Sequence, residues 1–93
     1  MGQAVLVNQK DNVVTAVSDL KEGEEAAYGA GSDRRQIKTT EAIPFGHKIA
    51  LSQIAKDSGI VKYGEIIGRA KTDIEPGEWV HTHNTLEIYT PSR

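Results

Sequence analysis

A nine-residue motif that occurs twice constrains the fold of this chain more than any other feature of its sequence. Residues 16–24 and 70–78 both read Ala-x-Ser/Thr-Asp-Leu/Ile-x-x-Gly-Glu, and residues 50–59 form a looser third copy that is one residue longer. In each copy we expect a strand to leave its sheet and make one turn, which Ser18 or Thr72 caps and a glycine closes. The motif therefore predicts a pseudo-symmetric fold of similar half-units. The offset of 54 residues between the two matching copies is too long for a solenoid.

The apolar residues between these motifs come in short runs separated by turn signals, without a sustained helical period. The polar segment 8–12 predicts a hairpin loop, and the glycines of the second half are typical of tight turns. We expect strands at residues 4–7, 13–17, 25–28, 36–39, 47–51, 60–63, 65–70, 79–83 and 86–89. The pattern predicts a mostly β chain in which residues 1–93 form a single domain.

Composition excludes several classes of protein. A formal net charge of -2 and a pI near 5.9 give no basic surface for nucleic acid. The absence of cysteine excludes disulfides, thiolate catalysis and iron–sulfur ligation by this chain. No apolar run approaches the ~18 residues that a membrane span needs, and no signal peptide is visible, so we expect a cytoplasmic protein. A chain of 93 residues buries only about two-thirds of its unfolded surface, so a partner subunit would help its modest core.

Two of the three histidines, His81 and His83, are separated by one residue close to the C-terminal end of the sequence. On a strand they would point to the same face, where they could hold a metal or transfer protons to an anionic substrate. Asn84 would reach such a site from the following turn. Imidazole together with carboxylate suits Fe, Mn or Zn, and another chain would have to complete the site. The alternative is that both histidines are exposed strand residues beside Trp79.

The third histidine lies in the segment 43–50, where a Pro/Gly turn precedes an apolar strand. His47 could act as an acid or a base, and Lys48 could neutralise a carboxylate. The alternative is a turn histidine beside a solvated lysine. Lys62 lies in a second polar turn, Lys62-Tyr63-Gly64-Glu65. This turn could be only a hairpin corner.

Three ordered motifs, at residues 43–51, 61–70 and 73–84, give the chain a family resemblance. Together they resemble the SAF domain of the altronate/galactarate dehydratase family, which occurs as an N-terminal domain or as a separate small subunit. The match is strong over residues 42–84. The preceding forty residues agree in pattern with weaker motifs, and residues 29–35 make a longer loop than usual.

The resemblance implies a β-clip fold of short strands and long bent hairpins, with one or two short helical turns. It implies a large catalytic partner subunit and a small anionic hydroxy-acid substrate, and it leaves the oligomeric state open, including a homo-oligomer. The implied reaction is β-elimination of water from a 2-hydroxy acid to give a 2-keto acid. Alternatives are the small subunit of a sulfolactate sulfo-lyase and a non-catalytic SAF-type carbohydrate-binding or adaptor module.

The same resemblance assigns roles to residues and a cofactor. It implies a divalent metal, Fe²⁺ with Mn²⁺ as an alternative, shared with or held by the large subunit, and His81 and His83 are its candidate ligands. His47 and His83 are the candidate catalytic groups. Lys48, Lys62 and Asn84 are the candidate substrate-binding residues.

Overall fold

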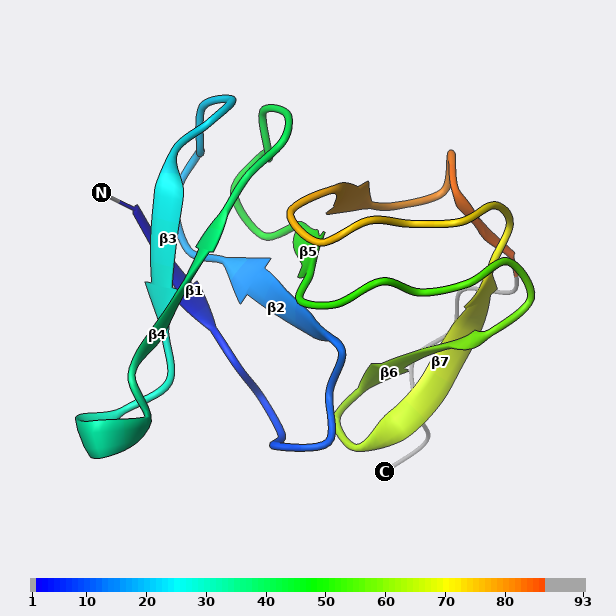
Figure 1. Cartoon of the computed structure of the whole chain (residues 1–93), viewed down its shortest axis with the longest axis horizontal. Helices are drawn as coiled ribbons and strands as arrows, with labels where there is room; N and C mark the ends of the chain where they lie inside the picture. Colours follow the sequence, from blue (N-terminus) through cyan, green and yellow to red (C-terminus); the bar gives the residue numbers. More distant parts are fainter. Residues whose placement is uncertain (1, 87–93) are drawn as a thin grey trace.

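The computed structural model describes residues 2–86 and confirms a mostly β chain of the β-clip type (Figure 1). Its elements are β1 (Gly2–Val5), β2 (Val13–Ala16), β3 (Glu25–Tyr28), the 3₁₀ turn η1 (Gly31–Asp33), β4 (Arg35–Lys38), β5 (Lys48–Ala50), β6 (Gly59–Lys62), β7 (Glu65–Ala70), β8 (Trp79–Val80) and β9 (Thr85–Leu86). No helix among residues 2–86 is long and apolar enough to cross a membrane.

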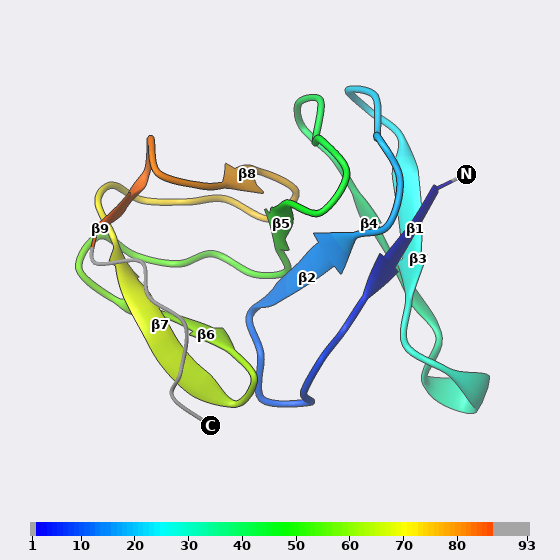
Figure 2. The ribbon, with the colours of Figure 1, turned by 180° about the vertical axis from the view of Figure 1, so that it is seen from behind.

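The strands form two sheets. One has the order β4-β3-β1-β2-β5-β8 and the other has the order β6-β7-β9. Strands β1 and β3 run parallel, and the other pairs are antiparallel. Strands β1, β3 and β4 lie at one end of the molecule and β6 and β7 at the other, with β2 and β5 between them (Figures 1 and 2). The middle strands β2 and β5 therefore connect the two ends.

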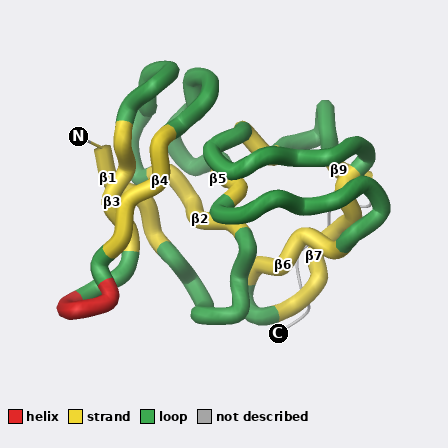
Figure 3. The backbone as a smooth tube through the Cα atoms, in the orientation of Figure 1, coloured by secondary structure: helices red, strands yellow, loops and turns green. Residues whose placement is uncertain are grey.

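The backbone conformation of the repeated motif occurs four times within residues 2–86. We call these copies the first, second, third and fourth turn units; they span residues 17–25, 40–48, 51–59 and 71–79. Each places one apolar residue in the core: Leu20, Ile43, Ile54 and Ile74 are 0–2% exposed. The first unit bridges the second through Leu20 and Ile43, and the third bridges the fourth through Ile54 and Ile74. Figure 3 shows the last two units as adjacent loop segments. The described residues thus hold two pairs of similar turn units, although the sheets beside them are unequal, one of six strands and one of three.

Every unit closes through the same turn. The N–H of Glu24, His47, Ser58 and Glu78 donates to the carbonyl three residues earlier, over 2.9–3.1 Å. The residue before each donor has a positive φ, as a type II turn requires: Gly23 +78°, Gly46 +85°, Asp57 +73° and Gly77 +90°. Asp is one of the few non-glycine residues that tolerate this region. The third copy was expected to be one residue longer than the others. This expectation is wrong, because Asp57 and not Gly59 occupies the position of the glycine, so the copies have equal length.

The caps also differ from expectation. Ser18 and Thr72 were expected to cap the turns, but the aspartates that follow them do so across each pair. The Asp19 carboxylate accepts the Phe45 N–H at 2.8 Å, and the Asp73 carboxylate accepts the Lys56 N–H at 2.8 Å. A carboxylate that accepts a hydrogen bond from a backbone N–H makes a charge-assisted bond, so each aspartate stabilises the turn of the unit with which its own unit is paired.

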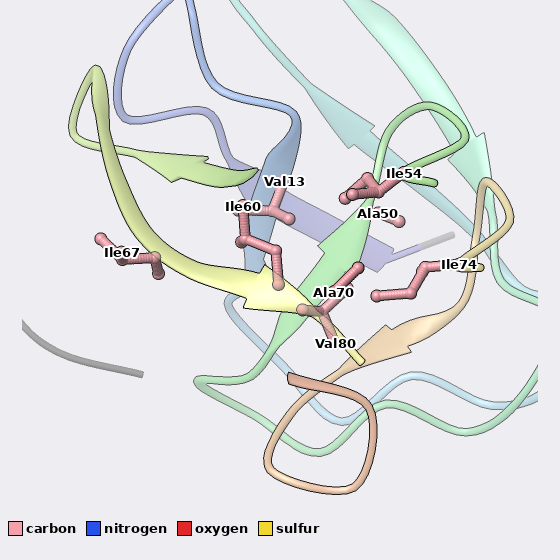
Figure 4. Close-up of a cluster of buried hydrophobic side chains, with 8 residues drawn as sticks. All are labelled: Val13, Ala50, Ile54, Ile60, Ile67, Ala70, Ile74 and Val80. Atoms are coloured by element: carbon pink, nitrogen blue, oxygen red, sulfur yellow. The ribbon is translucent and has the colours of Figure 1, made fainter. Parts of the chain in front are cut away.

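Two apolar clusters form the core. One lies between the sheets and consists of Val13, Ala50, Ile54, Ile60, Ile67, Ala70, Ile74 and Val80 (Figure 4). The other lies under the larger sheet and consists of Ala4, Val14, Ala16, Leu20, Ala26, Ile43 and Ile49, with Trp79 packed against it. Alternate residues of β2 and β5 point to opposite faces of the sheet, so they pack into different clusters. Each pair of turn units thus contributes to its own cluster.

A buried carboxylate ties the two ends together. Asp11, in the β1–β2 loop, accepts the N–H of Asn8 at 3.0 Å, of Gly64 at 2.8 Å and of Tyr63 at 3.2 Å. Asn12 adds bonds to the Val61 backbone in both directions. The loop that the sequence predicted as a plain hairpin connection is therefore an anchor for the β6–β7 hairpin.

Candidate functional site

The centre of the candidate site is a hydrogen bond between two aromatic side chains. His47 ends the turn of the second unit, and Trp79 begins β8, which pairs with β5 through Ile49. The Trp79 Nε1–H donates to His47 Nδ1 at 3.0 Å, with ring centroids 5.5 Å apart. The second and fourth units meet at this bond, because the strands that follow them are neighbours in the sheet.

His81 and His83 lie against the same indole. The His81 ring is stacked on Trp79, 5.6 Å between centroids and 13° between planes, and the His83 ring is tilted at 5.1 Å. His81 also lies 4.5 Å from His47. The structure thus brings all three histidines of the sequence around Trp79.

The reason for this gathering differs from the one expected. Residues 79–83 were expected to be one strand whose alternation places both histidines on one face. The strand β8 ends at Val80, and the histidines lie in the turn that follows. The expected strand 86–89 lies mostly outside the described residues, although β9 reaches Leu86. It is the fold of the turn, not strand alternation, that brings the two rings to Trp79.

Asn84 builds that turn. It is 5% exposed, its side-chain oxygen accepts the His81 N–H at 2.9 Å, and its amide nitrogen donates to the Trp79 carbonyl at 2.8 Å. Its backbone N–H donates to the His81 carbonyl at 3.1 Å. Asn84 therefore fixes the backbone on both sides of Val80, and its predicted contact with a substrate hydroxyl stays a prediction.

The electrostatics of the site follow first from burial and then from the crowding of cationic groups. Burial first, and then the charges of His47, Lys48 and His83, lower the pKa of His81. Its ring therefore keeps a lone pair at a lower pH than an isolated histidine does, as a metal ligand or base requires. Burial first, and then Lys62, lower the pKa of Lys48. A bound anion would relieve this repulsion.

Both predicted lysines therefore lie in electrostatic reach of one another. Lys48 is half-buried on β5, and the amino group of Lys62 lies 5.0 Å from the centre of the Tyr63 ring. Thr15 stands opposite Lys48 on β2, and its hydroxyl oxygen is buried without a hydrogen-bond partner among residues 2–86. Lys48 also reaches the histidines, because its charge acts on His81.

The donor set fits a divalent metal only in part. His81 and His83 offer two imidazoles, ligands that Fe²⁺ and Mn²⁺ accept. Within residues 2–86, however, no three His, Cys, Asp or Glu side chains are grouped so that they would hold an ion. Within residues 2–86, these two imidazoles are thus not joined by a third side chain of these four types.

The loop at residues 29–35 contributes to a different feature. With the β1–β2 loop it lines an open groove of about 1040 Å³, whose walls include Lys10, Asp33 and Arg35. None of the predicted site residues lines this groove. The groove and the histidine site are thus separate parts of the surface.

Sequence reasoning missed two members of the site. Trp79 was noticed only as a neighbour of the histidines, although it is the sole tryptophan and lies two residues before His81. A single tryptophan beside a histidine pair was the available signal. Thr15 carried none, because its place opposite Lys48 depends on the pairing of β2 with β5.

Comparisons with known proteins agree with the sequence resemblance. A family model described as the altronate/galactarate dehydratase SAF domain matches residues 2–87. Altronate dehydratase from Bacillus subtilis (strain 168) is 42% identical over 100 residues, covering 98% of this chain and 19% of that protein. The altronate dehydratase of Escherichia coli (strain K12) is 40% identical, covering 89% and 16%.

A third relative is nearly covered by the match. The (2R)-sulfolactate sulfo-lyase subunit alpha of Chromohalobacter salexigens is 38% identical over 85 residues, which cover 85% of this chain and 88% of that subunit. This chain thus spans less than a fifth of the two altronate dehydratases and most of the sulfo-lyase subunit. By the extent of the model match and by these identities, the chain belongs to the SAF-domain family of the altronate/galactarate dehydratases.

Proposed function

We propose that this chain supplies one side of the active site of a cytoplasmic sugar-acid dehydratase of the altronate/galactarate type. The observation that carries the proposal is the gathering of His47, His81 and His83 around Trp79, in a chain whose relatives are dehydratases and a sulfo-lyase. The reaction is β-elimination from a 2-hydroxy acid. The α proton and the β leaving group depart, and the enol that results becomes a 2-keto acid.

A large catalytic subunit or domain completes the site. Two facts support this part of the proposal: the small share of the altronate dehydratases that the chain covers, and the absence of a three-ligand group among residues 2–86. His81 and His83 would hold a shared divalent metal, Fe²⁺ or Mn²⁺. When bound, such an ion acts as a Lewis acid on oxygen atoms of the substrate.

The chain's own residues bind and orient the substrate. Lys48 and Lys62 attract its carboxylate, whose charge offsets the repulsion between them. His47, whose ring lies 4.5 Å from that of His81, acts on the same substrate, and Asn84 holds the turn in place and offers its amide to a hydroxyl. His83 is exposed and is the candidate base for the α proton. A nitrogen that ligates a metal has no lone pair for a proton, so His83 takes one role in a given turnover.

The sulfo-lyase reaction is the second candidate, and one observation favours it. The match covers 88% and 82% of the alpha subunits of two (2R)-sulfolactate sulfo-lyases, so a domain of this kind makes up most of a subunit in those enzymes. The elimination is the same except that sulfite leaves in place of water.

The test is reconstitution with the large partner. The purified pair, supplied anaerobically with Fe²⁺ or Mn²⁺, is assayed for 2-keto acid and for sulfite on altronate, galactarate and (2R)-sulfolactate. We expect a keto acid from at least one sugar acid, and none from either protein alone. Release of sulfite would select the second candidate. Binding of these acids without turnover would overturn both lyase proposals and leave a carbohydrate-binding module.

The two roles of His83 separate in the same assay. If His83 is the base, His83→Ala lowers kcat by about 10²-fold or more at saturating metal. If it is a ligand, the same variant mainly raises the metal concentration needed for half-maximal activity. His83→Gln is the matched variant that keeps polarity at this exposed position.

A further inference from the structure

We propose that Trp79 is a positioning residue that holds His47 in one tautomer, with its proton on Nε2, so that His47 serves as a hydrogen-bond donor to an oxygen of the substrate and not as its base. The role toward substrate rests on the proposed function. The tautomer itself rests on the structure alone and is tested separately.

The hydrogen bond sets the position of the proton. An indole N–H donates only, so the His47 Nδ1 that receives it at 3.0 Å must present a lone pair. A neutral imidazole has one N–H, which must then be on Nε2. Among residues 2–86, Trp79 is the only hydrogen-bond partner of this ring. The Nε2–H is therefore left for a ligand or for the partner protein.

The same bond opposes the two other roles of a histidine. A general base at Nε2 needs its lone pair there, which would move the proton to Nδ1. An imidazolium acid carries protons on both nitrogens. In either case two N–H groups would face each other across 3.0 Å, and the Trp79 bond would be lost. Donation from Nε2 is the one role that keeps the bond.

The backbone of each partner is held in place. The backbone N–H of Trp79 donates to the Glu41 carboxylate at 3.2 Å, its backbone carbonyl accepts the Asn84 amide at 2.8 Å, and its ring stacks on His81. The His47 carbonyl accepts the Ala16 N–H at 2.8 Å, and its own N–H closes the turn. The donor is thus oriented before any substrate arrives, which is what electrostatic preorganisation requires.

The recipient is an oxygen with a lone pair. A 2-hydroxy acid offers such atoms in its carboxylate and hydroxyl groups, and a hydrogen bond to a charged carboxylate is the stronger kind. The proton of the elimination then goes to another group, His81, His83 or a residue of the partner.

The direct test is NMR of the full chain labelled with ¹⁵N, at a pH about two units above the ordinary histidine pKa. We expect a scalar coupling across the hydrogen bond between the nitrogens of Trp79 Nε1 and His47 Nδ1. We also expect the nitrogen shifts of a protonated Nε2 and an unprotonated Nδ1. A protonated Nδ1, or the absence of this coupling in a resolved spectrum, would overturn the proposal.

Trp79→Phe sharpens the test because it keeps an aromatic ring beside His81 and removes the indole N–H, together with part of the indole ring. We expect its His47 nitrogen shifts to move toward the average of two exchanging tautomers. Unchanged shifts in a folded variant would contradict the positioning role. If the variant does not fold, the scalar coupling in the wild-type chain still tests the tautomer of His47.

The donor role is tested in the reconstituted enzyme with His47→Gln and His47→Ala. Glutamine keeps an amide N–H near the position of Nε2 but cannot take up a proton at neutral pH. We expect His47→Gln to retain at least about 10-fold more kcat than His47→Ala. Equal loss in both variants would refute donation. If the pair has no activity while the coupling is present, the proposed function fails and the tautomer assignment stands.

Discussion

The first pair of turn units, at residues 17–25 and 40–48, and the second pair, at residues 51–59 and 71–79, share one backbone design. In both pairs two apolar residues bridge and two residues adopt a positive φ. They differ at the last residue of the turn, which is Glu24, His47, Ser58 or Glu78. Only the second unit places a histidine there, and only the fourth continues into Trp79. The repeated backbone sets the positions of the side chains. The chemistry then depends on which residue occupies the last position of the turn, which we call the variable position.

The site lies where the two pairs meet. Strand β5 follows the second unit, β8 follows the fourth, and these strands are neighbours in the sheet. Neither pair alone brings His47 to Trp79. If this comparison is right, a substitution in the core of either pair should lower the free energy of unfolding by about the same amount. A substitution at the variable position should change function and leave the chain folded.

The largest effect is expected from the bridging isoleucines. Ile43→Ala and Ile74→Ala, at positions 0–1% exposed, should each lower the free energy of unfolding by about 4 kcal/mol, because each leaves a cavity in one of the two clusters. Urea unfolding measures this. Ile66→Ala, at a residue 55% exposed, is the matched control and should cost less than about 1 kcal/mol. A large loss in one pair only would break the symmetry of the comparison.

Two glycines of the turns should differ in cost. Gly77→Ala forces φ +90° on alanine and drives its Cβ into the Lys38 carbonyl, so we expect a loss of about 3 kcal/mol. Gly46→Ala has φ +85° and open space, so only the backbone strain of about 1 kcal/mol applies. Thermal unfolding of both variants gives the comparison. Equal losses would show that the contact between fourth unit and β4 is not tight.

The next largest effect is expected at Asp11, which anchors the β6–β7 hairpin to the β1–β2 loop. Asp11→Ala leaves three backbone N–H groups without their acceptor, and we expect a loss of about 2 kcal/mol. Hydrogen exchange should show faster exchange at Tyr63 and Gly64, in the hairpin that Asp11 holds. Asp33→Ala, at an exposed position, serves as control and should change stability by less than about 0.5 kcal/mol. Slow exchange at both amides in Asp11→Ala would refute the anchor.

The smallest effect is a pH dependence from His81. Its pKa is lowered in the folded chain, chiefly by burial, so the unfolded chain binds this proton at a higher pH. Between the two pKa values the unfolded chain holds more protons, and the free energy of unfolding falls as the pH falls. Below the folded pKa the loss levels off. Unfolding measured from about pH 8 to about pH 5 should show a shallower slope for His81→Gln than for the wild type. Parallel slopes would exclude His81 as the cause.

Much of the fold was readable from sequence because its signals are local. Leu20 and Ile74 identify their units by spacing, and Gly23 and Gly77 identify the turns. The second unit escaped notice because Glu41, Ala42 and His47 stand where the motif has Ser/Thr, Asp and Glu, and the third was misaligned because Asp57 takes the place of a glycine. These failures share one cause: backbone geometry tolerates several residues at a position that the motif writes as one.

The site was less readable, because its contacts are long-range. The sequence pointed to His47, His81 and His83, but strand alternation was the wrong reason for their proximity. The Trp79–His47 bond joins residues 32 positions apart, and only the pairing of β5 with β8 brings them together. Asn84 was noticed as a neighbour of the histidines, yet its bonds to Trp79 and His81 depend on a turn that the strand assignment concealed.

The central claim is that the variable position of the second unit carries function, while the same position elsewhere in the scaffold does not. His47→Ala and Ser58→Ala change equivalent residues of two turn units, and the kcat of the reconstituted enzyme compares them directly. We predict that His47→Ala lowers kcat by about 10²-fold in a chain that stays folded, and that Ser58→Ala stays within about 2-fold of the wild type. Equal activity in the two variants would contradict the account.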